Sequence, residues 1–525
     1  MSRIILGLGG LLSRAACCVL RDGQFASAVE QAKISHHERP GAFPEEALSA
    51  ALKTADVTSQ QVDCVAIARP FALGPESVAQ LELRARFPHS EIVVVGHHRA
   101  HAASAYYVSP FDGATVLSVD RAGDFRSAVL FEANGRHLLP VRELYFPDSL
   151  GDLFNRVTEL LGYKTRADEH KVQWLSAYGR PDYIDVFRSI LRKGSGRWLY
   201  TDRTFFDADR LTQGGFSARF YDAIGIGMGE CIPQATRANL AASLQAAVNE
   251  TVASMLGEAT NVCIAGGLAL NTLLVRSLEQ TFPNVFVQPV AGNAGTALGA
   301  ALHAWHEVYQ ESTRVQFRTL CLGPSYTPIE VKQVLENCKL RFRYLLTEGE
   351  LIEQAIRVLN DSKIVAWMHG RMEFGPRALG NRSILASPLN PYSTENLNVF
   401  IKHRESFRKF AASVPVEQAD KYFEVGCNAR YLASVGHVRP EFRETFAAAT
   451  LGEDCIRVHT VDPEENPLYH ALLTATGKAT GLPVLYNTSF NLFGDPLVCT
   501  PRDAVRSFYS SGIDALFVGN FYLEK

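Results

Sequence analysis

The sequence predicts an α/β protein in which one α/β domain is internally duplicated and followed by a second α/β domain. Three successive strand patterns, then alternating helices and strands, occur in residues 1–113 and again in residues 114–315. After residue 315 the pattern changes to helices and a long segment punctuated by Gly and Pro. We therefore expect a first domain with halves of about 1–113 and 114–315, and a second domain over 320–525.

Composition sets limits on function. The 525 residues are 47% apolar and 20% charged with a net charge of -3, which is typical of a globular protein and gives no overall attraction to nucleic acid or anionic membrane. No run of eighteen uncharged apolar residues predicts a spanning helix. The ten cysteines include no CxxC pair, which favours a reducing cytoplasm over a disulfide framework or zinc ribbon. We read the apolar start, interrupted by Arg14, as strands rather than a signal peptide.

The first half begins with a predicted hairpin. Asp22-Gly23 separates two apolar runs, a typical hairpin signal, and the segment 97–107 has no helix breaker. We predict strands at 4–10, 15–20, 25–34, 62–68 and 91–96, and helices at 44–55 and 97–107.

The second half repeats this order. Asn134-Gly135 marks a turn between two of its strands, and two later strands each enter a Gly-rich turn before a helix. The predicted strands are 114–120, 127–135, 137–146 and 261–267, followed by a helix at 271–282 and a strand, turn and helix over 284–305. Actin-like and sugar-kinase ATPases have such a duplicated, ribonuclease-H-like domain with a cleft between its halves, so we expect this architecture here.

The second domain contains a concentration of basic residues. Helices are predicted at 327–338 and 348–360. The segment 363–388 is predicted to begin with a strand and to continue as a basic, loop-like stretch up to residue 388. The segment from Arg371 to Lys409 contains seven basic residues and three acidic ones. The basic excess is therefore local, in a chain that is slightly acidic overall.

Two histidines four residues apart suggest a metal site. On a helix, His97 and His101 would lie on one face, and Asp120 at the end of a strand could add a carboxylate. The HxxxH spacing is a weak signal, and two hydrogen-bonded histidines at a helix N-terminus are the alternative.

Two glycine turns suggest a nucleotide site. Gly266-Gly267 and Gly292-Asn293-Ala294-Gly295 each lie between a strand and a helix, where backbone N–H groups can approach a phosphate or ribose. Tight packing turns explain these residues equally well. There is no GxxxxGK[ST] loop and no GxSxG motif, which excludes a P-loop mechanism and leaves little support for a covalent hydrolase.

Three arginines in a Gly-rich loop suggest an oxyanion pocket, because guanidinium groups suit bidentate recognition of phosphate or carboxylate. Nucleic acid is the rival ligand, but few aromatic residues interrupt the segment. The candidate binding residues are Arg371, Arg377, Arg382, Lys402, Arg404 and Arg408, with Asn381, Asn487, Ser489 and Asn491.

Eight segments together resemble one known family. They are residues 97–111, 149–162, 169–179, 263–271, 370–388, 401–413 and 485–501, with Ser118-Val119-Asp120. In order and content, these segments are similar to the O-carbamoyltransferase family of nodulation and antibiotic-tailoring enzymes, along nearly the whole chain.

The resemblance implies a two-domain enzyme. Its first domain would be an actin-like carbamoyl-transfer domain, and residues 320–525 would form a YrdC-like domain that makes carbamoyl adenylate from ATP and carbamoyl phosphate. The adenylate would pass internally to an acceptor hydroxyl, because such a mixed anhydride hydrolyses in water. A small-molecule acceptor, a hydroxyl of a secondary metabolite, is implied, with Mg²⁺ accompanying ATP; a homodimer is left open.

The resemblance also assigns residue roles. His97, His101 and Asp120 match metal ligands for Fe²⁺ or Zn²⁺, and Lys171 lies in a matching loop whose role is not fixed. The matching nucleotide-binding turn contains Gly266, Gly267 and Asn271; Gly292, Asn293 and Gly295 remain candidate nucleotide-binding residues from the turn pattern alone. The matching catalytic residues of the adenylating domain are Arg371, Arg377, Arg382, Lys402, Arg404 and Arg408.

Two departures from the family pattern affect the transfer domain. Residues 12–15 read Leu-Ser-Arg-Ala where the family has Gly-His-Asp-Ala, so Arg14 replaces a carboxylate. Asn293 replaces an aspartate of the metal site, and a neutral amide is a weaker ligand. We favour an active carbamoyltransferase; a member that only forms carbamoyl adenylate, or a non-catalytic nucleotide-binding subunit, is the alternative. A tRNA-modifying relative is disfavoured, since no basic, aromatic RNA surface is visible.

Overall fold

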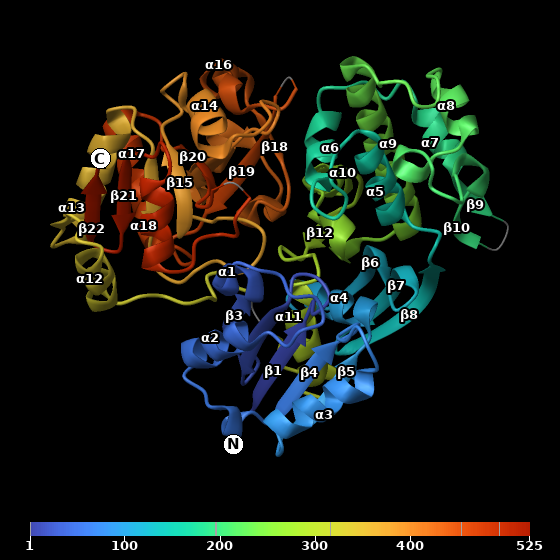
Figure 1. The fold of residues 1–525 in the computed structure, drawn as a ribbon, viewed down its shortest axis with the longest axis horizontal. Coiled ribbons are helices and arrows are strands. Elements are labelled where there is room, and N and C mark those ends of the chain that lie inside the picture. The colour runs from blue at the N-terminus through green and yellow to red at the C-terminus, as the bar shows by residue number, and fades with distance from the viewer. Residues whose placement is uncertain (1, 195–196, 315–316, 453, 493) are drawn as a thin grey trace.

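A computed structural model describes residues 2–194, 197–314, 317–452, 454–492 and 494–525. Three large sheets, each with helices packed on it, form the α/β fold (Figure 1). Within these ranges, no helix is both long enough and apolar enough to cross a membrane.

The first sheet is built from the first half of the N-terminal part. Its strands are β1 (Ile4–Gly9), β2 (Ala16–Arg21), β3 (Gln24–Glu30), β4 (Cys64–Ala68) and β5 (Glu91–Val95). The strand order is β3-β2-β1-β4-β5, with β1, β2 and β3 antiparallel and β1, β4 and β5 parallel. The helices are α1 (Gln31–Ser35), α2 (Glu45–Ala55), α3 (Glu76–Arg86) and α4 (His97–Tyr106).

The second sheet repeats the topology of the first. Its strands are β6 (Gly113–Gly123), β7 (Arg126–Asn134), β8 (His137–Tyr145), β11 (Asn261–Ala265) and β12 (Asn284–Val287). The order β8-β7-β6-β11-β12, antiparallel for the first three strands and parallel for the last three, matches the first sheet strand for strand. The predicted duplication is therefore confirmed.

Helix α11 (Gly295–His303) joins the two halves by packing against α4 and β1. At Gly299 a Cβ atom would lie 1.7 Å from the carbonyl oxygen of Ala100 on α4. The backbones of these two helices therefore touch, and a side chain at this position would force them apart.

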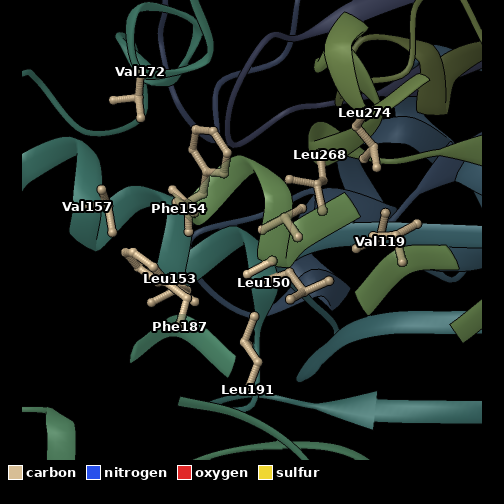
Figure 2. Close-up of a cluster of buried hydrophobic side chains, with 14 of the residues drawn as sticks. Val119, Leu150, Leu153, Phe154, Val157, Val172, Phe187, Leu191, Leu268 and Leu274 are labelled. Carbon is tan, nitrogen blue, oxygen red and sulfur yellow. The ribbon is translucent and has the colours of Figure 1, made fainter. Parts of the chain in front are cut away.

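A helical lobe is formed mainly by the segment between β8 and β11, with one helix added after β11. It contains α5 (Leu150–Leu160), α6 (Glu169–Ser176), α7 (Ile184–Ile190), α8 (Ala218–Ile224) and α9 (Gln234–Leu256), the hairpin β9 (Leu191–Gly194) and β10 (Arg197–Thr201), and α10 (Thr272–Thr281) after β11. Leu150, Leu153, Phe154 and Val157 have the i, i+3, i+4, i+7 spacing of one helix face, and they lie in the buried core in Figure 2. Ser149 caps α5 by accepting a hydrogen bond from the Asp152 N–H.

The C-terminal part forms a ten-stranded mixed sheet. Its strands are β13 (Arg343–Tyr344), β14 (Val365–Met368), β15 (Arg382–Ala386), β16 (Ala411–Pro415), β17 (Phe423–Glu424), β18 (Gly436–Val438), β19 (Cys455–Val461), β20 (Leu485–Ser489), β21 (Ala515–Val518) and β22 (Phe521–Glu524). The order is β13-β22-β21-β14-β15-β20-β16-β19-β18-β17. The helices are α12 (Pro328–Asn337), α13 (Glu348–Asn360), α14 (Ser393–Asn396), α15 (Ala419–Tyr422), α16 (Arg443–Phe446), α17 (Pro467–Thr480) and α18 (Pro501–Tyr509).

Helix α17 positions part of the candidate site. Its Tyr469, Leu472 and Leu473 pack with α13 and with Leu385 and Leu485 on one face of the ten-stranded sheet. Farther along the same face, the side chains are polar. Figure 1 shows this sheet beside the helical lobe, with α6 on the side of the lobe that faces it.

Two sequence predictions need correction. The strand predicted at 25–34 ends at Glu30, because the Gln31 N–H donates to Ala15 and the Gln31 side chain bonds Glu46 and the Ala47 N–H, which begins α1. The loop predicted to extend to residue 388 instead ends in strand β15, which pairs with β14 and β20.

Candidate functional site

The two predicted histidines and the aspartate meet in one cluster. His97 and His101 project from α4 and Asp120 from β6. Oδ2 of Asp120 lies 3.1 Å from Nε2 of His97 and 3.5 Å from Nε2 of His101. One possible ligand atom from each residue lies within 4.8 Å of the other two, so the three can hold one ion.

Burial and charge in this cluster suit a metal ion. His101 is fully buried, and apart from the 3.5 Å approach of its Nε2 to Asp120, its ring nitrogens have no hydrogen-bond partner among the described residues. Burial opposes ionisation of Asp120, but hydrogen bonds from His101 and His97 outweigh it and hold the carboxyl pKa well below its ordinary value. Two imidazoles and one carboxylate are a donor set for Fe²⁺ or Zn²⁺, and Asn293 lies next to His101. The residues present therefore fit the metal that the resemblance implies.

The predicted nucleotide turns lie beside this cluster. Gly266 has φ +98°, and a Cβ there would lie 2.1 Å from the carbonyl oxygen of Val119, directly before Asp120. Close packing on β6 thus requires glycine at Gly266 whatever binds there. Asn271 caps α10 through the Leu274 N–H and donates to Gln245, so its side chain is already engaged.

The remaining turn residues lead into α11. Gly292 and Asn293 precede the helix and Gly295 is its first residue, while the Asn293 carbonyl accepts a hydrogen bond from the Thr296 hydroxyl. Gly267 lies so close to Asp120 that a Cβ would be 2.9 Å from Oδ1. Metal candidates and turns therefore form one region at the ends of the second-half strands.

A second cluster lies on the ten-stranded sheet. Asn487 on β20 and Arg457 on β19 are both in register with Ala411 on the strand between them. Residues in register on neighbouring strands share one face of a sheet, with strands about 4.8 Å apart. Ser413 and His459, two residues further along, are on this face as well and lie 3.1 Å apart.

Four guanidinium groups converge beside that face, on Arg377, Arg404, Arg408 and Arg457. Burial, and then the neighbouring Arg408, lowers the pKa of Arg377 to about 10 and that of Arg404 to about 9. Burial together with Arg377, Arg404 and Arg408 lowers the pKa of Arg457 well below its ordinary value. An arginine keeps its proton in proteins, so these shifts mean that the positive charges repel one another in a poorly solvated space.

These charges are poorly balanced by acids. Glu405 lies 3.8 Å from Arg408, but it also pairs with Lys171 at 2.9 Å. In the described part of the chain Arg377 makes no hydrogen bond or ion pair, and neither Nη2 of Arg404 nor Nε of Arg457 has a partner. The cluster therefore favours an anion with several oxygens.

Sequence reasoning missed Arg457. It lies outside the basic segment 371–409, in a strand whose neighbours Ile456 and Val458 are buried. The sequence did contain a signal: a charged residue between two apolar residues of a strand faces the side of the sheet opposite to theirs, and this could have marked Arg457 as a candidate site residue.

Helix α6 of the helical lobe covers the arginines. The centre of the Trp174 ring is 5.2 Å from the Arg457 guanidinium carbon, and Lys171 pairs with Asp168 and Glu405. Burial, with Arg408 and Arg377 nearby, lowers the pKa of His170 to about 3. The cluster is therefore enclosed between the lobe and the C-terminal sheet, which gives Lys171 a position that the sequence could not fix.

Two of the predicted catalytic arginines are engaged elsewhere. Arg382 is fully buried and donates to the carbonyls of His369, Gly370, Asn381 and Pro324. Arg371 donates to the carbonyls of Gly323, Leu322 and Ala26. Both side chains hold backbone in place, in contrast to the unpaired Arg377.

The other predicted polar residues also have defined partners. Lys402 donates to the carbonyls of Ser489 and Asn491 and to the Asn491 side chain, which also accepts from the Ser489 hydroxyl. Asn381 donates to the Arg371 carbonyl and accepts from Asn466. Lys402 adjoins Arg404 and Arg408, which with burial depress its pKa, so it lies at the edge of the arginine cluster.

A buried carboxylate organises the loop that carries Arg377. Oε1 of Glu373 accepts the backbone N–H groups of Leu379, Asn381 and Arg382 at 2.8 to 3.0 Å. Its Oε2 has no partner among the described residues, and the same is true of Asn487 Oδ1 and the Tyr469 hydroxyl. Buried polar atoms without partners are rare, and here they indicate a place for a small polar ligand.

Comparison with known proteins identifies the family. The models of the carbamoyltransferase N-terminus and C-terminus match residues 72–302 and 356–525. An uncharacterized protein of Synechocystis is 32% identical over 99% of this chain and 96% of its own length. The nodulation protein NolNO of Sinorhizobium fredii is 31% identical over 97% of this chain and 78% of its own length.

A relative with a named reaction is more distant. The 3'-hydroxymethylcephem-O-carbamoyltransferase of Streptomyces clavuligerus is 27% identical over 82% of this chain and 80% of its own length. Among solved structures, component A of (R)-2-hydroxyglutaryl-CoA dehydratase from Acidaminococcus fermentans covers 58% of this chain and 99% of its own, at 15% identity and a TM-score of 0.38. With both domain models matched in order, and relatives above 30% identity along most of their length, the chain belongs to the carbamoyltransferase family and is a transferase.

Proposed function

We propose that the protein makes carbamoyl adenylate from ATP and carbamoyl phosphate at the arginine cluster and transfers the carbamoyl group to a hydroxyl of a small molecule. The observation that carries the proposal is the excess of half-buried guanidinium groups that lie close together on Arg377, Arg404, Arg408 and Arg457. A bound phosphate would relieve their repulsion and satisfy donors that otherwise lack acceptors.

The neighbouring unpaired atoms suit the carbamoyl end of the substrate. A carbamoyl –NH₂ donates two hydrogen bonds, and Asn487 Oδ1 and Glu373 Oε2 are acceptors without donors. Asn487 shares a sheet face with Arg457, so one ligand can place its phosphate on the arginines and its amide toward the interior. Tyr469 can donate its hydroxyl proton to the carbamoyl oxygen.

The reaction sequence balances with these substrates. Water hydrolyses carbamoyl phosphate to carbamate and phosphate; a carbamate oxygen then attacks the α-phosphorus of ATP, and pyrophosphate leaves. The acceptor oxygen attacks the carbamoyl carbon, the bond to AMP breaks, and the acceptor hydroxyl loses its proton. Arginines stabilise the charge that shifts onto phosphate oxygens in the first steps, and Mg²⁺ would accompany ATP.

The transfer step belongs to the His97, His101 and Asp120 cluster. An Fe²⁺ or Zn²⁺ ion held by these residues would supply Lewis acidity. His97 is oriented by the Arg69 carbonyl, 3.2 Å from its Nδ1, which leaves Nε2 directed at Asp120. Arg14, in the turn after β1, pairs with Glu38 and offers no base, so proton removal from the acceptor would fall to other groups.

Pyrophosphate release tests the proposal. Purified protein with ATP, Mg²⁺ and carbamoyl phosphate is expected to release pyrophosphate and phosphate, and omission of carbamoyl phosphate should stop pyrophosphate release. Carbamoylated hydroxyl compounds from a metabolite pool would then be sought by a mass increase. Absence of pyrophosphate release under all these conditions would refute the adenylation step.

Arg14 and Asn293 favour one alternative, a protein that forms carbamoyl adenylate without metal-assisted transfer. It predicts pyrophosphate release together with clearly sub-stoichiometric iron and zinc in the purified protein. Near-stoichiometric metal would exclude it.

A further inference from the structure

We propose that Lys33 and Glu30, both in the N-terminal part of the chain, are positioning residues for carbamoyl adenylate formation at the C-terminal arginine cluster; the inference rests on the proposed function. Lys33 lies on α1 and Glu30 ends β3. Figure 1 shows α1 where the first half meets the C-terminal part. No feature of the sequence near residue 30 points to this role.

The contacts are specific. Nζ of Lys33 donates to the carbonyls of Glu373 at 2.9 Å and Gly375 at 2.6 Å, and it forms an ion pair with Glu30. Oε2 of Glu30 accepts the N–H of Gly375 at 3.0 Å. The N–H and the carbonyl group of Gly375 are therefore both bound by one ion pair from the N-terminal part of the chain.

The contacts of Lys33 and Glu30 are largely shielded from solvent. The Lys33 side chain is 9% exposed and that of Glu30 is 13% exposed. A buried lysine is tolerated only with its charge paired and its protons donated, and Lys33 meets both conditions through Glu30 and the loop. Ile34 adds apolar contact to Met372, Ala378, Leu497 and Cys499.

The loop that carries Arg377 needs these contacts because Arg377 lies close to other positive charges. Arg377 lies two residues beyond Gly375, and the positive charge of Arg408 opposes its position. This repulsion acts to displace Arg377 from the cluster, so the loop that carries Arg377 must be held by other contacts. Glu373 binds the far end of the loop at Leu379, Asn381 and Arg382, and Lys33 with Glu30 binds the near end, so the Arg377 backbone is fixed on both sides.

The same segment reaches toward the transfer site. The Gln31 N–H donates to the Ala15 carbonyl, in the turn after β1 that contains Arg14, and the Gly41 N–H donates to the Leu11 carbonyl. Residues 30–41 thus contact both the Arg377 loop and this turn. Disturbing Lys33 should affect adenylation first, because among the described residues its Nζ donates only to the Arg377 loop and Glu30.

The test measures pyrophosphate release by the full chain. The variants are Lys33→Met and the double change Glu30→Gln with Lys33→Met, which leaves no unpaired buried charge and keeps an acceptor for the Gly375 N–H. Lys53→Met, at an exposed position on α2, is the matched control. We expect both Lys33 variants to raise the KM for carbamoyl phosphate at least tenfold, with the control unchanged.

The readouts separate positioning from stability. Thermal unfolding is measured for every variant, and kinetics are taken well below each midpoint. A lower midpoint with an unchanged KM in the double variant would show that the pair only stabilises the fold, and would overturn the inference. Wild-type protein that releases no pyrophosphate would overturn the proposed function and this inference together; normal wild-type release with unaltered variants would overturn this inference alone.

Discussion

The guanidinium carbon of Arg457 lies 5.2 Å from the centre of the Trp174 indole ring. The arginine comes from the C-terminal sheet and the tryptophan from the helical lobe, so the contact closes the arginine cluster on one side. A cation above an indole face gains about 0.5 to 2 kcal/mol, more when solvent is excluded. The contact also means that the arginine cluster lies where the C-terminal sheet meets the helical lobe.

Replacing Trp174 with leucine should weaken substrate binding without stopping chemistry. The aromatic cover of Arg457 is lost, and we expect the KM for carbamoyl phosphate to rise about tenfold, which corresponds to about 1.4 kcal/mol. Trp174→Phe keeps an aromatic face and should retain most of the affinity. Steady-state pyrophosphate release measures both; equal KM values for the leucine variant and wild type would contradict a role for the indole.

Arg377 and Arg382 should respond in opposite ways to substitution. Arg377→Ala removes an unpaired charge from a repulsive cluster, so pyrophosphate release should fall at least a hundredfold while thermal stability stays equal or rises. Arg382→Met leaves four backbone carbonyl groups without their donor and should lower the free energy of unfolding by about 3 kcal/mol or more. Arg502→Met, at an exposed position on α18, is the control for both. An inactive, destabilised Arg377 variant would place that residue with the structural arginines.

Acid should destabilise the protein partly through His170. Burial, with Arg408 and Arg377, lowers its pKa to about 3, against about 6.5 in the unfolded chain. Between these values the unfolded chain binds a proton that the native chain does not, so the free energy of unfolding falls as the pH falls, by at most about 1.4 kcal/mol per pH unit.

The variant His170→Gln should therefore lose less stability than wild type between pH 7 and pH 5, measured by urea unfolding at each pH. Exposed His89→Gln is the control and should behave as wild type does. The same loss in His170→Gln and wild type would show that His170 is not held neutral by the cluster.

Metal occupancy should depend on residue 293. Asn293 adjoins His101, and a carboxylate at this position would add a charged oxygen ligand to His97, His101 and Asp120. Asn293→Asp is expected to retain at least tenfold more iron or zinc than wild type after dialysis against a competing chelator, by elemental analysis, because the chelator reveals the difference in affinity. Exposed Asn337→Asp controls for the added charge; equal retention in the two variants would remove Asn293 from the metal site.

The sequence predicted the parts of the fold that depend on local pattern. The duplicated strand order, helix α4 with both histidines, and the hairpin at Asp22-Gly23 all follow from apolar periodicity and turn residues. The start of α1 did not, because it is set by hydrogen bonds from Gln31 to Ala15 and Glu46, which are contacts between segments.

The site shows the same division. Charge density along the chain located the loop of Arg377 and the segment of Arg404 and Arg408. It could not separate these from Arg382, whose two terminal guanidinium nitrogens donate to backbone carbonyls. Arg457 and Lys33 lie outside any basic run, and only tertiary packing brings them to the loop or cluster. Long-range register and burial are not encoded in local composition.

The touching backbones of α4 and α11 have a consequence for motion in the first domain. Because Gly299 leaves no room between these helices, the histidines on α4 and the turn before α11 move as one body when the two halves shift. Any relative movement of the two halves must then bend the chain elsewhere, so the positions of His97 and His101 relative to the turn before α11 should be the same with the nucleotide present and with it removed.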